Sequence, residues 1–360
     1  MSRSIRNNFF PAPDFLTVPC FGLDLSGESL KFIELIESAH GIRIGRHGER
    51  KILPGIIESG KIKDLKKMQD LLISLRKEEK IKAVRVSLPE EQVYLFKLRL
   101  EKAGLESIRE GIEFSLEEHI PITAQDVIFD YQILSEDAQG LDIQVAAIPE
   151  EVVEEYLSVF ENSNIVVKSF ELEAQAISRA VVKDGDMDTY MIVDFGEKRS
   201  GICIVSKGVV MFTSTVDVGG VILTNMIQKN FKISFEEAEK MKKKFGLQRN
   251  SVNKELFSVL LNSVSILRDE IEKHFLYWHT HLDEDEKERP SIKKIILCGG
   301  DSNLIGIAEY FSVSIKCKVD IANVWVNVFN LENEIPDINF DKSLTYATAL
   351  GLALGDFLNN

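Results

Sequence analysis

The chain has 360 residues, of which 44% are hydrophobic and 28% charged; this length and balance exclude a disordered or fibrous protein and predict two or more packed lobes. The formal net charge of −14 argues against a protein that mainly grips phosphate backbones, so we expect no nucleic-acid partner. No stretch approaches the ~20 apolar residues that cross a bilayer, and the four scattered cysteines are typical of reduced thiols in a cytoplasmic protein.

The first predicted element follows a segment, residues 1–17, that lacks the apolar core of a secretion signal and is expected to be a flexible tail. This element is a β-hairpin over 20–38, in which two apolar strands meet at a small-residue turn that starts at Asp24. Residues 190–216 repeat the pattern, with Asp194 at the corresponding turn. Two copies so far apart in the chain predict a duplicated lobe rather than a short-period repeat.

The segment between the hairpins mixes helical and strand patterns. An amphipathic helix is predicted over 63–79 and a strand over 83–89. The alternation of strands and helices from 90 to about 165 predicts a small inserted α+β module. A helix over 171–181 then leads into the second hairpin.

After the second hairpin the pattern becomes mainly helical. Helices are predicted over 218–231, 235–246 and 254–279. A strand, a glycine turn and a helix follow over 293–311, and a closing helix over 343–358 is rich in small residues, which suits close packing.

The two hairpin turns could bind a metal–nucleotide complex. Asp24 and Asp194 each end a strand at a turn, where a carboxylate can hold a hydrated Mg²⁺ that bridges phosphate oxygens. Backbone N–H groups of both turns can cradle phosphates, and Lys31 could lie near the first turn. Taken singly, either turn is more simply explained as an ordinary hairpin with an acidic or glycine corner.

Two further motifs could contact the nucleoside. Gly299 and Gly300 stand between a predicted strand and a predicted helix, where a helix N-terminus favours phosphates and glycine lets the backbone approach a ligand closely. A plain strand-to-helix turn is the alternative. Glu239 and Lys242 lie one helical turn apart on one face, and a solvated ion pair would also explain them.

The order of these motifs resembles the actin-like ATPase superfamily, in which two duplicated lobes clamp ATP between two phosphate hairpins and a GG adenosine motif. Within it the chain is most similar to the PilM family of type IV pilus assembly, a relative of the cell-division protein FtsA. The segments that carry the resemblance are FGLDLSGESLKFIEL, EHIPI, VDFG, VGG with Thr224, EEAEKMKKKFG and ILCGGDSNLIGIAEYF.

The resemblance implies an α/β fold, namely the two-lobed, actin-like (ribonuclease H-like, duplicated) ATPase fold with a small α+β inserted module. The division of the chain that we expect is a first lobe over 18–86, 166–189 and 344–360, the module over 87–165, a second-lobe core over 190–226 and 293–343, and a helical subdomain of the second lobe over 227–292.

The resemblance also implies a site for ATP and Mg²⁺, with Asp24 and Asp194 on the metal side. Glu173 matches by position the catalytic glutamate that orients the attacking water in some relatives, although a solvent-facing helix residue is the alternative. The first turn has Ser26 and then Gly27 where the family often has Asp-x-Gly, so it lacks the positive-φ freedom of glycine at that point. The residues expected around the cofactor are Asp24, Ser26, Gly27, Lys31, Asp194, Gly196, Ser200, Glu239, Lys242, Gly299, Gly300 and Ser302.

For function, the resemblance implies a cytoplasmic ATP-binding scaffold of type IV pilus assembly that is at most a slow ATPase. Its expected partner is the cytoplasmic tail of an inner-membrane pilus protein similar to PilN, docked between the first lobe and the module under nucleotide control. The chain would then lie at the inner membrane without entering the bilayer, and it could form a homo-oligomer. Two alternatives remain open: an actin-like phosphotransferase or active ATPase, and a filament-forming cytoskeletal protein similar to FtsA.

Overall fold

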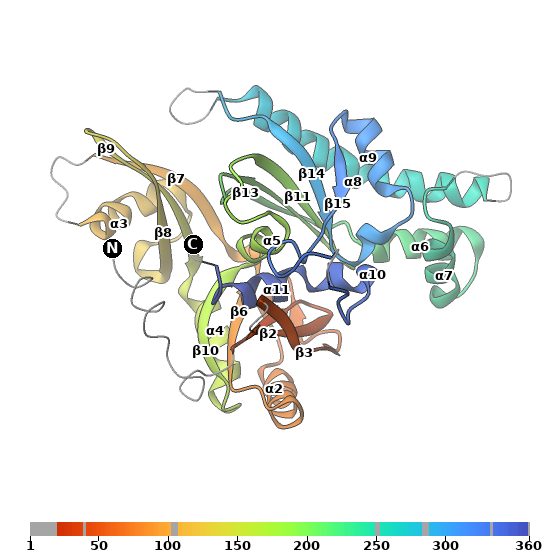
Figure 1. The fold of residues 1–360 in the computed structure, drawn as a ribbon, viewed down its shortest axis with the longest axis horizontal. Helices are drawn as coiled ribbons and strands as arrows, with labels where there is room; N and C mark the ends of the chain where they lie inside the picture. The colour runs from red at the N-terminus through yellow and green to blue at the C-terminus, as the bar shows by residue number, and fades with distance from the viewer. Residues whose placement is uncertain are drawn as a thin grey trace.

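Two five-stranded sheets form the centres of two lobes in the computed structural model, and a three-stranded sheet stands beside them (Figure 1). The structure describes residues 20–38, 41–101, 107–248, 253–282, 288–331 and 334–358, so the expected tail over 1–17 lies outside the described residues. The first sheet contains β1 (Cys20–Leu25), β2 (Ser29–Ser38), β3 (Gly41–Lys51), β6 (Ala83–Leu88) and β10 (Val166–Leu172). The second contains β11 (Thr189–Phe195), β12 (Ser200–Ser206), β13 (Val209–Val216), β14 (Ile292–Cys298) and β15 (Val319–Ile321).

The two large sheets share one topology. Their strand orders are β3-β2-β1-β6-β10 and β13-β12-β11-β14-β15. In each sheet the central strand pairs antiparallel with its hairpin partner and parallel with the strand on its other side. Asp24 lies opposite Lys31 in the first hairpin, and Asp194 lies opposite Gly201 in the second. The predicted duplication is therefore confirmed.

Helices cover both sheets at positions close to the sequence prediction. They are α2 (Leu65–Glu79), α4 (Glu150–Glu161), α5 (Glu173–Val181), α6 (Gly220–Phe231), α7 (Phe235–Phe245), α8 (Lys254–Thr280), α9 (Ile307–Ile315), α10 (Phe340–Ser343) and α11 (Ala347–Leu354). Local sequence fixes the start of α7, because Ser234 and Glu237 form a capping box. Within the described residues, no helix combines the length and the apolar character that crossing a membrane requires.

The small-residue helix α11 lies between β1 of the first sheet and α5, and all of its residues are buried. Gly22 faces it so closely that a Cβ there would lie 1.8 Å from the carbonyl oxygen of Ala349. A Cβ on Gly351 would lie 1.7 Å from the carbonyl oxygen of Ala176. Only glycine permits these two backbone approaches. The core around α11 contains residues from both large sheets, so it holds the two lobes together.

The three-stranded sheet has the order β7-β9-β8 and belongs to the inserted module, with strands β7 (Tyr94–Glu101), β8 (Val127–Glu136) and β9 (Gly140–Pro149). One face packs on α3 (Ile108–His119) through side chains such as Ile143 and Val145. Helix α4, which the sequence reading placed in the module, packs instead on α2 and on the first-lobe core, where Tyr156 is fully buried. Its apolar face is therefore covered by the first lobe rather than by the small sheet.

Candidate functional site

A cavity of about 770 Å³ lies between the two lobes. The turns of both hairpins, helix α7, the glycine turn after β14 and the segment 341–348 line it. Most of the residues expected around the cofactor are in this lining, together with the expected catalytic residue: Asp24, Ser26, Lys31, Glu173, Asp194, Gly196, Glu239, Lys242, Gly299 and Gly300. Segments far apart in the sequence therefore meet where the resemblance implied a nucleotide site.

Three expected residues do not line the cavity: Gly27, Ser200 and Ser302. The Ser200 side chain is fully buried and its Oγ donates to the carbonyl oxygen of Val218 at 2.5 Å. The Ser302 Oγ donates to the carbonyl oxygen of Cys298. Because each hydroxyl already donates to a main-chain oxygen, these two serines hold the turns in shape rather than face the cavity.

The two aspartates enter the cavity from equivalent strands. Asp24 is 7% exposed and accepts a hydrogen bond from Ser87 Oγ at 3.2 Å. Burial raises the pKa of Asp24 above its usual value, although the Lys31 ammonium, 3.9 Å from Oδ2, lowers it. Burial, and then the charge of Asp24, raise the pKa of Asp194 to about 6. Two desolvated carboxylates that disfavour each other's charge are well placed to accept a cation.

The residues present fit Mg²⁺ better than a metal held by protein ligands alone. Within the described ranges, no cluster of three or more His, Cys, Asp or Glu side chains could hold a metal ion. Mg²⁺ commonly takes one or two carboxylates and completes its shell with water and substrate phosphates. Asp24 and Asp194 supply such a pair, so a metal here would need the phosphates of a nucleotide to complete its coordination.

The glycine turn after β14 brings the backbone against Asp194. Gly299 has φ +86°, and a Cβ there would lie 2.3 Å from Asp194 Oδ1, so the position requires glycine. The expected helix does not start directly behind the glycines. A short 3₁₀ turn, η4 (Gly300–Asn303), follows them, and helix α9 begins only at Ile307. The turn therefore offers close backbone approach without an α-helix N-terminus.

Lys242 and Glu239 form a buried network on the second-lobe side rather than a solvated pair. Lys242 is 3% exposed, and its Nζ lies 2.9 Å from Glu239 Oε2 and 2.7 Å from Asp301 Oδ1. Thr224 Oγ1 donates to Glu239 Oε2 at 2.6 Å. Although burial opposes it, the hydrogen bonds from Thr224 and Lys242 lower the pKa of Glu239. The network fixes one wall of the cavity. Asp301, which belongs to this network, was not among the site residues expected from the sequence.

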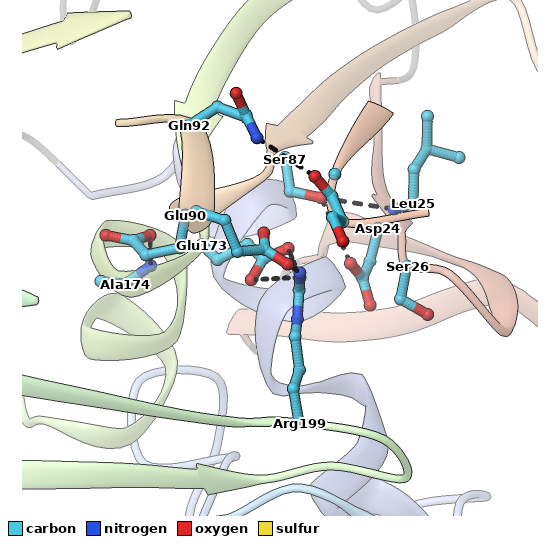
Figure 2. A network of polar contacts seen from close by, with 12 residues as sticks. Asp24, Leu25, Ser26, Ser87, Glu90, Gln92, Glu173, Ala174 and Arg199 are labelled. Atoms are coloured by element: carbon cyan, nitrogen blue, oxygen red, sulfur yellow. Dashed lines mark hydrogen bonds and ion pairs between the residues drawn. The ribbon is translucent and has the colours of Figure 1, made fainter. Parts of the chain in front are cut away.

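Glu173 lies at the first position of α5 and faces the cavity, where Arg199 of the β11–β12 turn reaches it (Figure 2). Arg199 Nη2 is 2.9 Å from Glu173 Oε1, and its Nη1 contacts Glu91. Burial, and then the charge of Asp24, raise the pKa of Glu173 well above its usual value, which opposes the charged form, whereas an adjacent guanidinium favours it. Arg199 was not among the expected site residues, and the only local hint of it is the Lys-Arg pair in the turn DFGEKRS.

A second ion pair joins the two hairpin turns across the cavity. Lys198 Nζ lies 3.0 Å from Glu28 Oε1. Glu28 belongs to the turn of the first hairpin and Lys198 to the turn of the second. The sequence analysis missed both, because nothing local shows that the two turns face each other.

A groove of about 800 Å³ lies between the inserted module, helix α5 and the loop that joins β12 to β13. The module contributes the sheet face opposite α3, on which Leu95, Ala146 and Asp130 form one cross-strand row. Ile128 and Met187, also in the lining, are 41% and 66% exposed. Exposed apolar side chains in a concave surface are typical of a protein-binding site.

Comparison with known proteins gives the family and the fold. A family model described as type IV pilus assembly protein PilM matches residues 22–357. Among solved structures, a chain of a PilM–PilN type IV pilus biogenesis complex is similar with a TM-score of 0.77 and 18% identity, over 95% of this chain and 99% of that one. EutJ from Carboxydothermus hydrogenoformans has a TM-score of 0.56 and 16% identity, over 96% and 91%.

Two further similarities agree with this. MreB5 of Spiroplasma citri bound to ADP has a TM-score of 0.52 and 16% identity, over 93% of this chain and 95% of that one. The cell-division protein FtsA of Enterococcus hirae is 27% identical over 191 residues, which is 48% of this chain and 43% of that protein, so the match spans less than half of that relative. The fold is the actin-like fold that the sequence predicted, and the chain belongs to the PilM family of type IV pilus assembly proteins.

Proposed function

We propose that this protein binds ATP with Mg²⁺ in the cavity between its lobes and, under nucleotide control, binds the cytoplasmic tail of a PilN-like protein of the inner membrane. The observation that supports it most is the pair of aspartates, Asp24 and Asp194, which two equivalent hairpins present to one cavity of about 770 Å³. A similar fold in MreB5 is described as bound to ADP, which favours a nucleotide as the ligand.

The chain's own residues suggest how the nucleotide would be held. Asp24 and Asp194 would bind the hydrated metal, which when present neutralises phosphate charge. The backbone N–H groups of Ser26 and Gly196 already donate to Ser29 O and Arg199 O, so other N–H groups of the same two turns would contact the phosphates. Gly299 leaves room for the nucleoside, and the ion-paired Glu239 lies in the same wall of the cavity. Ser26 replaces a frequent glycine, yet its N–H donates to Ser29 O and its Oγ to the same oxygen, both at 3.0 Å, so the turn is formed without glycine.

Glu173 is not arranged for rapid hydrolysis in this structure. Its carboxylate is ion-paired with Arg199 through both oxygens, at 2.9 and 3.2 Å. A carboxylate that orients an attacking water must have an oxygen available to it. In this arrangement hydrolysis would require Arg199 to move away from Glu173 first, and we therefore propose a protein that holds ATP or hydrolyses it slowly.

The groove between the module and α5 is the site we propose for the partner's tail. The similar structure is titled as a PilM–PilN complex, which favours a PilN-like partner here. Apolar side chains line the groove together with charged side chains of both signs, namely Arg179, Lys183 and Lys207 and the acids Asp130, Glu171, Asp184 and Asp186. A short peptide with apolar side chains flanked by charged ones would match this lining. Through that partner the protein would lie at the cytoplasmic face of the inner membrane.

Thermal unfolding with and without Mg-ATP tests the nucleotide half of the proposal. Ligand at a hundredfold its Kd adds about 2.7 kcal/mol to the stability of the native state, which moves Tm by several degrees. We expect this shift in the wild-type protein and its loss in Asp194→Asn. A folded, nucleotide-free wild-type protein whose Tm does not respond to Mg-ATP would contradict the proposal.

Two further measurements separate the proposal from the alternatives. Steady ATP turnover above about 1 s⁻¹ would indicate an active enzyme rather than a scaffold. Nucleotide-dependent sedimentation would indicate a filament. We expect slow or no turnover, no sedimentation, and binding of a synthetic PilN tail peptide detected by fluorescence anisotropy.

A further inference from the structure

Arg199 joins two sites, namely the cavity in which we propose that the nucleotide binds and the end of the groove at which α5 begins. It lies in the β11–β12 turn of the second lobe, which lines the cavity. Its guanidinium crosses to the first-lobe side, where it pairs with Glu173 at 2.9 Å and also contacts Glu91 (Figure 2). Its side chain is 27% exposed, so both pairs are partly shielded from water and stronger than surface ion pairs.

The two acids paired with Arg199 stand at the start of two different groove walls. Glu173 opens α5, whose following residues Gln175 and Ser178 line the groove. Glu91 belongs to the short turn η2 (Glu90–Gln92), which leads directly into the module strand β7 and the groove residue Val93. One cation therefore ties the first-lobe wall to the module wall.

A second contact at the same place attaches a side chain of η2 to the backbone of α5. Glu90 Oε2 accepts a hydrogen bond from the backbone N–H of Ala174 at 3.1 Å, so η2 is attached to the first turn of α5. Glu91 Oε2 is buried and, in the part of the chain that the structure describes, has no hydrogen-bond partner. Arg199 is thus the cation paired with Glu91, and the loss of Arg199 would leave this partly buried acid without that partner.

Arg199 also lies at the part of the cavity in which we propose that the phosphates bind. Arg199 and Asp24 line the same cavity. Guanidinium binds phosphate through two parallel hydrogen bonds and does so more tightly than most neutral donors. A phosphate held next to Asp24 would therefore compete with Glu173 and Glu91 for the same group.

We propose that Arg199 is the positioning residue through which nucleotide binding controls the partner groove, an inference that rests on the function proposed above. With the cavity free of phosphate, Arg199 holds η2 against α5. When a nucleotide's phosphate draws the guanidinium away, Glu91 and Glu173 lose the cation that joins them, the two groove walls separate where α5 and η2 begin, and the tail peptide binds more weakly. By thermodynamic linkage the peptide weakens nucleotide binding by the same factor.

The test measures the Kd of a fluorescein-labelled synthetic peptide, the cytoplasmic tail of the PilN protein from the same organism, with and without saturating Mg-AMPPNP. We expect a ratio on the order of 5 to 10 for the wild-type protein and a ratio near one for Arg199→Ala. Glu91→Gln, which is isosteric and lies away from the phosphates, should also bring the ratio near one. Lys198→Ala is the matched control, because Lys198 is the adjacent cation of the same turn but pairs with Glu28; its effect on nucleotide affinity cancels in the ratio.

Each outcome decides between the two proposals. If both ligands bind the wild-type protein with a ratio of one, the coupling through Arg199 and the nucleotide control are both wrong, and only the two binding activities of the proposed function stand. If AMPPNP tightens peptide binding, the coupling through Arg199 is wrong and the proposed function stands. A ratio that survives in both Arg199→Ala and Glu91→Gln has the same meaning. If the wild-type protein binds no AMPPNP or no peptide, both proposals fall.

Discussion

Removing the charge of Asp194 should stabilise the protein while it abolishes Mg-ATP binding. Burial and the neighbouring Asp24 raise the pKa of Asp194 from its ordinary 3.8 to about 6, which corresponds to about 3 kcal/mol of unfavourable interaction in the charged form. Asparagine has nearly the same shape and no charge. We therefore expect Asp194→Asn to be about 2–3 kcal/mol more stable than the wild-type protein at pH 8.

The dependence on pH follows from the direction of this shift. Because the folded protein binds the proton more tightly than the unfolded chain does, the charged group costs nothing below about pH 4 and its full amount above about pH 6. The advantage of Asp194→Asn should be complete at pH 8 and should disappear as the pH falls from 6 to 4. Groups that do not interact with Asp194 titrate equally in both proteins and cancel in the difference, whereas Asp24 and Glu173, which interact with its charge, contribute to it.

Urea unfolding of both proteins at pH 8, 6 and 4 measures this difference, and thermal unfolding with Mg-ATP measures the loss of binding. A variant that gains stability and loses its ligand indicates a residue kept for function at a cost to the fold. If Asp194→Asn is less stable than the wild-type protein at pH 8, the carboxylate is held by favourable contacts and the reasoning about charge repulsion is refuted.

Three further predictions test the packing, the buried ion pair and the groove. Gly351→Ala should lower the free energy of unfolding, measured in urea, by about 3 kcal/mol or more, because its Cβ would lie 1.7 Å from the Ala176 oxygen. The control is Gly27→Ala, whose Cβ would lie 3.5 Å from the nearest atom. Its free energy of unfolding should change little. Lys242→Met should cost about 3–5 kcal/mol in the same assay, because it leaves Asp301 buried without a cation, whereas Lys243→Met, at a side chain 75% exposed, should cost less than about 1 kcal/mol. Ala146→Glu should weaken PilN tail binding by about tenfold or more in fluorescence anisotropy, since it places a desolvated charge in the groove. Phe114→Glu, at an 89% exposed position on α3, should leave this binding unchanged. For each of the three predictions, an equal effect of the variant and its control would contradict the structural assignment.

The sequence alone determined the duplicated architecture. Alternating apolar residues around Asp24 and Asp194 predicted two hairpins, because strand periodicity and turn residues are local properties. The small-residue run of α11 predicted close packing in the same way. The family resemblance named the site residues, and the structure brings most of them into one cavity.

Only the tertiary structure decided which side chains meet across the lobes. Arg199 with Glu173, and Lys198 with Glu28, come from different lobes, so no local pattern could pair them. The same holds for Lys242, whose burial beside Asp301 excludes the solvated pair that helix spacing allowed. Helix periodicity shows that a face is apolar but not which surface covers it, and the partner surface depends on how distant segments pack. For this reason the secondary structure and the fold could be predicted from the sequence, whereas the charge contacts that link the cavity to the groove could not.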